Sequence, residues 1–250
     1  MRIVWLLGLV GLMAVLLSAS TGGTVTSVAQ VLVESSLDES IEKTESVSSS
    51  QTAAAALDWP QVQRDAQRTG YTPEVLGTSI QVAWRHDFHP EKVYPQVQAI
   101  IYQGKVFVGT EMGIVYALNA QTGDQEWVYD VGAPILNSVV AANGKVLVGA
   151  MDGAVYALDA AGGSLVWKSQ LSWRLGFSTA PVIAEGKVML GGRNGVFYAL
   201  SPETGEVLWQ YDVNAPILQT AAWNSGRVFF GAMDMYVYAL NGVDGSLSWQ

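Results

Sequence analysis

The sequence contains no cysteine. The chain can therefore form no disulfide, and it carries no thiolate nucleophile and no Cys ligand for a metal. Histidine is nearly absent too, because His86 and His89 are the only two. Asp87 and Glu91 lie near them, but a metal site needs more ligands at better-defined spacing. We expect a solvated loop there and predict no metal site.

Positive charge is also scarce. The 13 Lys and Arg residues face 22 Asp and Glu residues, which gives a formal net charge of −9. Proteins that bind nucleic acid neutralise phosphate groups with an excess of basic side chains, and polybasic segments are what bind anionic lipid headgroups. The composition argues against both partners and leaves proteins or small molecules.

The N-terminus lacks a run long enough to span a membrane. Residues 3–17 are uncharged and apolar, 15 residues in all, whereas a spanning helix needs about 20. The run follows Met1-Arg2 and precedes the small residues 18–20, which is the layout of a signal peptide. We predict a signal peptide over 1–20 and export to the periplasm or the extracellular space. An uncleaved N-terminal membrane anchor is the alternative.

Residues 17–20 resemble a bacterial lipoprotein cleavage box in which Ser20 stands where the lipidated Cys belongs. Without that thiol there is no acceptor for the acyl chain, so no lipid anchor is predicted. Residues 21–57 are rich in Ser, Thr and Ala and contain no aromatic residue. Such a segment buries too little apolar surface to offset its ordering entropy. It is predicted to be a disordered acidic linker, with a short helix over 37–47 as the alternative.

The rest of the chain contains four copies of one pattern. Each copy has Tyr-Ala-Leu, then Gly, then Trp, and all three positions step by 40, 42 and 40 residues. A fixed period of this length means that each repeat is one supersecondary unit that buries its apolar face against its neighbours. The repeated positions are Tyr116, Tyr156, Tyr198 and Tyr238; Gly123, Gly163, Gly205 and Gly245; and Trp127, Trp167, Trp209 and Trp249.

Each repeat contains short runs rich in Val, Phe and Tyr that end at Gly, which is typical of strands. In the first repeat these are 105–109 and 114–118, and the Trp lies on a further run, 125–129. Another strand is expected before the Gly-Lys or Gly-Arg turn, within 134–141, 180–184 and 216–222 of the later repeats. Four antiparallel strands every 40 residues form a propeller blade. The sequence therefore predicts an all-β propeller over 58–250, with repeats near 95–130, 134–170, 180–212 and 216–250.

The turns within the repeats contain Gly where a tight hairpin needs positive φ. Asp152-Gly153 and Asn194-Gly195 fit this pattern, but the fourth repeat has Asp234-Met235. Because Met is sterically disfavoured at positive φ, we expect a different turn there.

The motif Ala-x-(Asp/Asn)-x-x-Thr-Gly-x-x-x-Trp resembles the docking motif of the PQQ-like, or quinoprotein-type, β-propeller repeats. Residues 117–127 match it fully, and 199–209 depart only at Ser201. Repeats two and four have Gly162 and Asp244 in place of Thr. The resemblance implies that the four Trp residues pack between adjacent blades, and we assign these Trp residues and their Gly partners to structural blade docking.

Residues 58–72 also resemble the N-terminal entry of such proteins, and 80–88, with Trp84, resemble an outer strand. In this family such a strand commonly completes the last blade and closes the ring. Family members usually have six to eight blades, so the four blades are expected to be part of a larger ring. A closed four-bladed ring is the alternative.

The resemblance also raises an enzymatic alternative. Quinone dehydrogenases of this fold hold the quinone PQQ over a Trp, bind Ca²⁺ through carboxylate and amide oxygens, use a catalytic Asp and typically contain an adjacent Cys pair. That pair is absent here. Glu111, Asp152 and Asp234 lie in hairpin turns, where acidic residues are expected for turn chemistry alone. No catalytic, cofactor-binding or metal-binding residue is predicted, and PQQ and Ca²⁺ enter only under this alternative.

One connection between repeats is longer than the others. Residues 171–177 replace the shorter connections at 130–132 and 212–214 and contain Trp173, Arg174 and Phe177. This composition is typical of an interface hot spot, so these three residues are the candidate partner-binding site. The alternative is that Trp173 and Phe177 pack back onto the blade edge.

The favoured function is a non-catalytic, extracytoplasmic scaffold that binds proteins or exposed β-strands. Within the family the chain is more similar to the propeller subunit of the outer-membrane protein assembly machinery, and to propeller sensor domains, than to the dehydrogenases. This step rests on fold analogy, and the absent lipid Cys is a departure from the assembly subunit. A PQQ- and Ca²⁺-dependent dehydrogenase and a ligand sensor are the alternatives.

Overall fold

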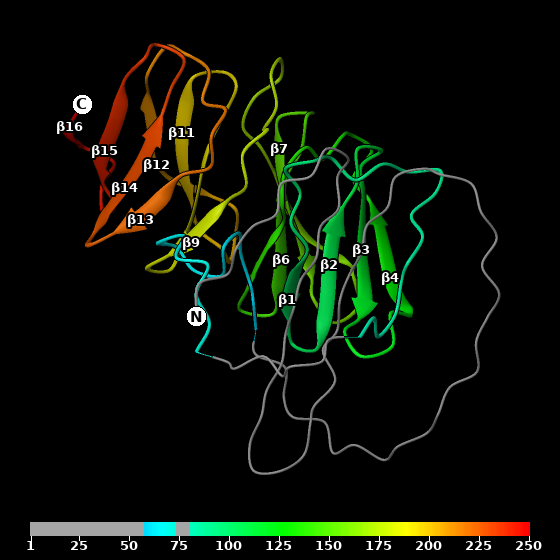
Figure 1. Cartoon of the computed structure of the whole chain (residues 1–250). Helices are drawn as coiled ribbons and strands as arrows, with labels where there is room; N and C mark the ends of the chain where they lie inside the picture. Colours follow the sequence, from blue (N-terminus) through cyan, green and yellow to red (C-terminus); the bar gives the residue numbers. More distant parts are fainter. Residues whose placement is uncertain (1–57, 74–80) are drawn as a thin grey trace.

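The computed structural model describes residues 58–73 and 81–250. The predicted signal peptide and acidic linker lie outside these residues. The described residues contain no helix and form four four-stranded antiparallel sheets, which confirms an all-β protein with four blades. Figure 1 shows the sheets fanning out in chain order, from β1–β4 in green to β13–β16 in red.

Within each blade the strand order is the chain order. Blade 1 contains β1 (Ile100–Tyr102), β2 (Lys105–Gly109), β3 (Ile114–Asn119) and β4 (Gln125–Asp130). Blade 2 contains β5 (Val140–Ala142), β6 (Lys145–Gly149), β7 (Ala154–Asp159) and β8 (Leu165–Gln170). Blade 3 contains β9 (Val182–Ala184), β10 (Lys187–Gly191), β11 (Val196–Leu200) and β12 (Val207–Asp212). Blade 4 contains β13 (Ala222–Asn224), β14 (Arg227–Gly231), β15 (Val237–Asn241) and β16 (Leu247–Trp249).

The burial of each strand follows from its place in the blade. The second strands β2, β6 and β10 are buried at every residue after the first, because neighbouring blades cover both faces of each sheet. They accordingly read as continuous apolar runs. The outer strands β4 and β12 bury their Trp and expose most other residues. The inner strands are shorter than predicted and begin at the end of each predicted run, because the earlier residues of these runs form the connection from the preceding blade.

A Trp docks each blade onto the next one. The Nε1 of Trp127 donates a hydrogen bond to the carbonyl oxygen of Ala160 at 3.2 Å, and a β-carbon on Gly163 would come within 2.6 Å of the indole ring. Trp167 and Trp209 make the same pair of contacts with the following blade. The two glycines there, Gly205 and Gly245, have φ of 74° and leave room for the ring.

Trp84 uses the same geometry at the front of blade 1. Its Nε1 donates to the carbonyl oxygen of Ala120 at 3.1 Å, and its ring lies against Gly123. Residues 81–88 form no strand in the described part of the chain, although an outer strand was expected over 80–88. Trp84 thus occupies the position of an outer-strand Trp that precedes blade 1. Trp249, at the other end of the arc, is 45% exposed, whereas Trp127 and Trp209 are each 8% exposed.

The turn between the second and third strands of blade 4 does not differ as expected. Met235 has φ of 71°, close to the 80° of Gly153 and 84° of Gly195 at the equivalent positions. The bulky residue therefore adopts the left-handed conformation that the other blades assign to Gly. No following connection packs on this turn within the described residues, so the Met235 side chain extends outward instead of meeting neighbouring backbone.

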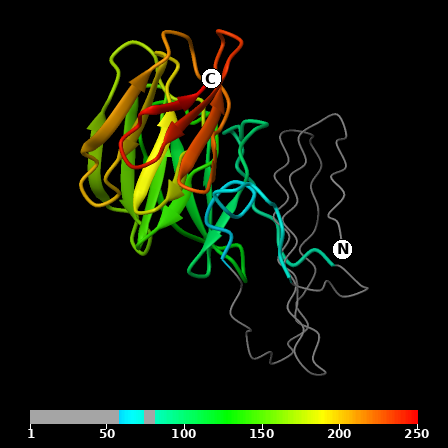
Figure 2. The same ribbon diagram turned by 90° about the vertical axis from the view of Figure 1, so that its left-hand side faces the viewer.

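The four blades form an open arc. The inner strand β1 neighbours β5, β5 neighbours β9, and β9 neighbours β13, but in the described residues β13 does not contact β1. Figure 2, viewed from the blade 4 side, shows the red blade in front and the earlier blades behind it. The closed four-bladed ring is therefore not the arrangement seen.

One short segment, residues 59–68, contacts the inner strands of all four blades in turn. Trp59 exchanges two backbone hydrogen bonds with Ile101 of blade 1, and Pro60 accepts one from the amide of Ala141 in blade 2. The side chain of Gln61 hydrogen-bonds both backbone groups of Ile183 in blade 3. Ala66 accepts a hydrogen bond from the amide of Trp223 in blade 4. The open backbone edges of the inner strands are thus paired with a segment of the same chain, drawn in cyan in Figure 1.

Arg68 fixes the end of this segment. Its guanidinium donates to the carbonyl oxygens of Val62 at 2.6 Å, Ala221 at 3.1 Å and Pro181 at 3.4 Å. Burial lowers the pKa of Arg68 to about 10, against the opposing effect of Asp65. The side chain remains charged at neutral pH, and carbonyl acceptors compensate its lost hydration.

Candidate functional site

The turns between second and third strands and the connections between blades meet on one face of the arc, which we call the loop face. The amide of Ile135 donates to the carbonyl oxygen of Thr110 at 3.1 Å, and the amide of Met233 donates to that of Pro216 at 3.0 Å. The loop face comprises the turns 110–113, 150–153, 192–195 and 232–236 and the connections 131–139, 171–181 and 213–221.

The connection 171–178 departs most from the repeat. The carbonyl of Gly176 accepts a hydrogen bond from Arg193, as those of Pro134 and Pro216 do from the equivalent turn residues. The extra length therefore lies in 172–175, which replace two residues in the shorter connections. Trp173 is at the tip of this insertion and is 86% exposed, and Arg174 is exposed beside it.

The base of the connection is held in place by several hydrogen bonds. The amides of Leu171 and Ser172 both donate to the carbonyl oxygen of Gly153 at 3.0 Å. The side-chain amide of Gln170 donates to the carbonyl oxygens of Ser172 at 2.7 Å and Asp152 at 2.8 Å. The tip thus extends from a base tied to blade 2, so less conformational entropy is lost when Trp173 binds a partner than with a free loop.

Phe177 does not belong to the exposed surface. It is 1% exposed and packs with Leu190 and Tyr198 in the core, and its amide donates to the carbonyl oxygen of Ala150 at 3.0 Å. Its inclusion among the contact residues was wrong, and packing against the blade, the alternative reading, describes it correctly. It occupies the repeat position of Ile135 and Ile217, spaced by the same 42 and 40 residues as the other repeat positions. That spacing was the sequence signal for its burial.

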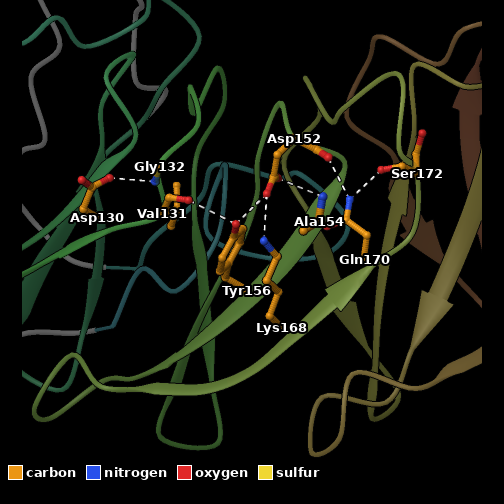
Figure 3. Close-up of polar contacts among 9 residues, drawn as sticks. All are labelled: Asp130, Val131, Gly132, Asp152, Ala154, Tyr156, Lys168, Gln170 and Ser172. Carbon is orange, nitrogen blue, oxygen red and sulfur yellow. Dashed lines mark hydrogen bonds and ion pairs between the residues drawn. The ribbon is translucent and has the colours of Figure 1, made fainter.

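Asp152 in the blade 2 turn is the centre of a polar network at the base of this connection (Figure 3). Its Oδ2 accepts hydrogen bonds from the Tyr156 hydroxyl at 2.6 Å and from Lys168 Nζ at 3.1 Å, and its Oδ1 accepts one from the amide of Ala154 at 3.0 Å. Partial burial acts to raise the pKa of Asp152, but these three donors outweigh it, so the pKa lies below its ordinary value.

The Tyr–turn pair recurs in the other blades and is structural. In blade 4 the Tyr238 hydroxyl donates to Asp234, which is the first cause of a Tyr238 pKa raised to about 12. In blade 1 the equivalent turn residue is Met112, and Glu91 of the entry segment accepts the hydroxyl of Tyr116 at 2.5 Å instead. Burial, followed by Glu91, raises the pKa of Tyr116 to about 12.

The described residues do not fit a quinone–Ca²⁺ site. Hard cations such as Ca²⁺ need several oxygen ligands, but no group of three His, Cys, Asp or Glu side chains within 58–73 and 81–250 could hold a metal ion. Asp152 and Asp234 already accept the hydroxyls of Tyr156 and Tyr238. His86 and His89 likewise belong to no such group in the described chain. No helix there is long and apolar enough to cross a membrane.

The comparison with protein families decides the relationship. The model described as outer membrane protein assembly factor BamB matches residues 78–172 and, again, 151–250. The chain belongs to this family of PQQ-like β-propeller repeats. The two overlapping matches reflect the internal repeat, since each covers more than two blades. A search of curated proteins found no match.

Solved structures with the same fold include quinoprotein enzymes. The quinohemoprotein alcohol dehydrogenase of Comamonas testosteroni superposes with a TM-score of 0.67 at 20% identity, over 77% of this chain and 40% of that one. A europium-containing methanol dehydrogenase gives 0.66 at 14% identity, over 77% and 48%. The quinohemoprotein alcohol dehydrogenase of Pseudomonas putida HK5 gives 0.64 at 18%, over 77% and 39%. The chain spans less than half the length of these proteins, and identities this low show a common fold alone.

Proposed function

We propose that this protein is a non-catalytic extracytoplasmic scaffold that binds other proteins, including extended β-strands, through its loop face. The observation that carries the proposal is Trp173, which is 86% exposed at the tip of an insertion whose base is fixed by Phe177 and backbone hydrogen bonds. Tryptophan and arginine are the residues most enriched at energetic centres of protein interfaces. A large aromatic side chain held out from a rigid base has little structural reason to be there.

Three further features support the proposal. The matching family model carries the description of an outer-membrane protein assembly factor, which is a binding role outside the cytoplasm. The N-terminal sequence is typical of a signal peptide. Finally, the inner strand edges are already paired with residues 59–68, which leaves the loop face and the outer edges for partners.

The test is capture of proteins from the envelope of the native source by the full chain and by the double variant Trp173→Ala, Arg174→Ala. Leu208→Ala is the matched control, since Leu208 is also exposed but lies on outer strand β12. We expect a partner that the wild type and L208A capture and the double variant loses, with unchanged circular dichroism for all three. Equal capture by all three folded proteins would remove the loop from the account.

A dehydrogenase remains the rival function, and it is tested separately by titration with PQQ and Ca²⁺. Tight quinone binding with reduction of an electron-accepting dye in the presence of an alcohol or sugar would overturn the scaffold proposal. A ligand-sensing role is supported by no residue that we can name.

A further inference from the structure

The turn of blade 4 contains a residue that the other blades do not tolerate there. In blades 1 and 3 a β-carbon on Gly113 or Gly195 would come within 2.6 Å of Ala133 or 2.8 Å of Ala215 in the next connection. Blade 4 has Met235 at this position, with φ of 71° and 97% of its surface exposed. A bulky side chain held in the left-handed region, without any packing to favour it, is an outlier that points to function.

Met235 is one of three highly exposed methionines on the loop face. Met233, in the same turn, is 61% exposed, and Met112, at the equivalent turn of blade 1, is 60% exposed. The chain has no cysteine, so thioethers are its oxidisable sulfur groups. Exposure governs how readily a thioether reacts with a soluble oxidant.

We propose that Met112, Met233 and Met235 form a reversible oxidation site through which peroxides alter the loop face. A lone pair of the thioether sulfur attacks one peroxide oxygen and the O–O bond breaks. That oxygen stays on sulfur, and the departing oxygen takes up the proton and leaves as water or an alcohol. Each sulfur loses two electrons, the peroxide gains them, and the product is methionine sulfoxide. A methionine sulfoxide reductase restores the thioether.

The modification changes the surface without a reason to unfold the blades. The three side chains make no buried contact in the hydrophobic clusters, whereas Met189 is fully buried within blade 3. A sulfoxide replaces a flexible apolar group by a polar acceptor, and the loop face therefore loses apolar area on both sides of Trp173. Any effect on partner binding rests on the proposed function, but the oxidation site itself does not.

The experiment treats the full chain with increasing hydrogen peroxide and measures the sulfoxide at each methionine by peptide mass mapping, as a gain of about 16 Da. Met189 is the internal control for a closed fold, followed by near- and far-ultraviolet circular dichroism. We expect complete conversion of Met112, Met233 and Met235 while Met189 stays reduced. Parallel oxidation of Met189 with the other three would overturn the proposal, because it would mean that oxidation follows unfolding.

A second measurement isolates the surface effect. Retention on a hydrophobic-interaction column should decrease after peroxide treatment of the wild type and recover after treatment with a sulfoxide reductase. The triple variant Met112→Leu, Met233→Leu, Met235→Leu keeps apolar side chains that cannot form sulfoxides, so its retention should stay constant. An equal decrease for the triple variant would assign the effect to other residues and overturn the proposal. Loss of partner capture in the Trp173 variants is independent of either result.

Discussion

The indole ring of Trp127 in blade 2's predecessor lies directly on Gly163 of blade 2, at a distance that leaves no room for a β-carbon. This pairing of outer-strand Trp and docking-turn Gly is the contact that holds consecutive blades together, and it recurs at Trp167–Gly205 and Trp209–Gly245.

Gly163→Ala is expected to destabilise the protein more than the same change at Gly144. Both glycines have positive φ, 76° and 72°, so both variants incur backbone strain of about 1 kcal/mol or more. A β-carbon at 144 meets nothing within 4 Å, whereas one at 163 collides with Trp127. Urea unfolding of the two variants measures the difference, and equal free energies of unfolding would contradict the docking role of this pair.

Trp127→Ala should cost about 3–5 kcal/mol, in the range of large-to-small core substitutions. Trp249→Ala should cost clearly less, because Trp249 is 45% exposed and no described residue covers it. The two variants remove the same side chain from equivalent strands, so the comparison isolates the contribution of the following blade. Similar losses of stability would show that the ring contributes within its own blade instead.

Arg68→Met is expected to reduce the stability of the whole arc by about 3 kcal/mol, since hydrogen bonds to charged groups contribute about 1.5–3 kcal/mol each and three carbonyl acceptors lose their donor. Arg64→Met is the control, because Arg64 donates only to the exposed carbonyl of Tyr71. Limited proteolysis should cut near residues 59–68 in R68M and spare them in R64M. Protection of this segment in both variants would argue against Arg68 as its fixing residue.

The Asp152 network predicts a definite pH dependence. Because the folded-state pKa of Asp152 is lowered, its contribution to stability is present above the unfolded value of about 3.9 and is lost as pH falls through the folded value. Asp152→Asn should therefore be less stable than the wild type at pH 7, and the gap should narrow in acid. Urea midpoints at a series of pH values measure this gap. A difference that is constant down to strong acid would contradict the assigned charge interactions.

Much of the fold could be predicted because the repeat signals are strong and local. The Tyr, Gly and Trp spacings predict the blades, and runs such as 105–109 coincide with strands. The conformation at Met235 could not be predicted, because the turn imposes its backbone geometry despite the unfavourable residue. The path of residues 59–68 across the blades could not be predicted either, since it depends on backbone groups that carry no sequence signal. Of the candidate contact residues, Trp173 and Arg174 are exposed and Phe177 is buried, a difference that the repeat spacing at Ile135 and Ile217 already encoded.

The central claim is that the tip of the 171–178 connection contacts another protein. It is tested most directly by placing a photo-crosslinking amino acid at position 173 of the full chain in its native source, with position 208 on β12 as the control. The account predicts one defined protein adduct from position 173 that position 208 does not give. No adduct from position 173 in a folded, correctly exported protein, together with quinone-dependent dye reduction, would contradict it.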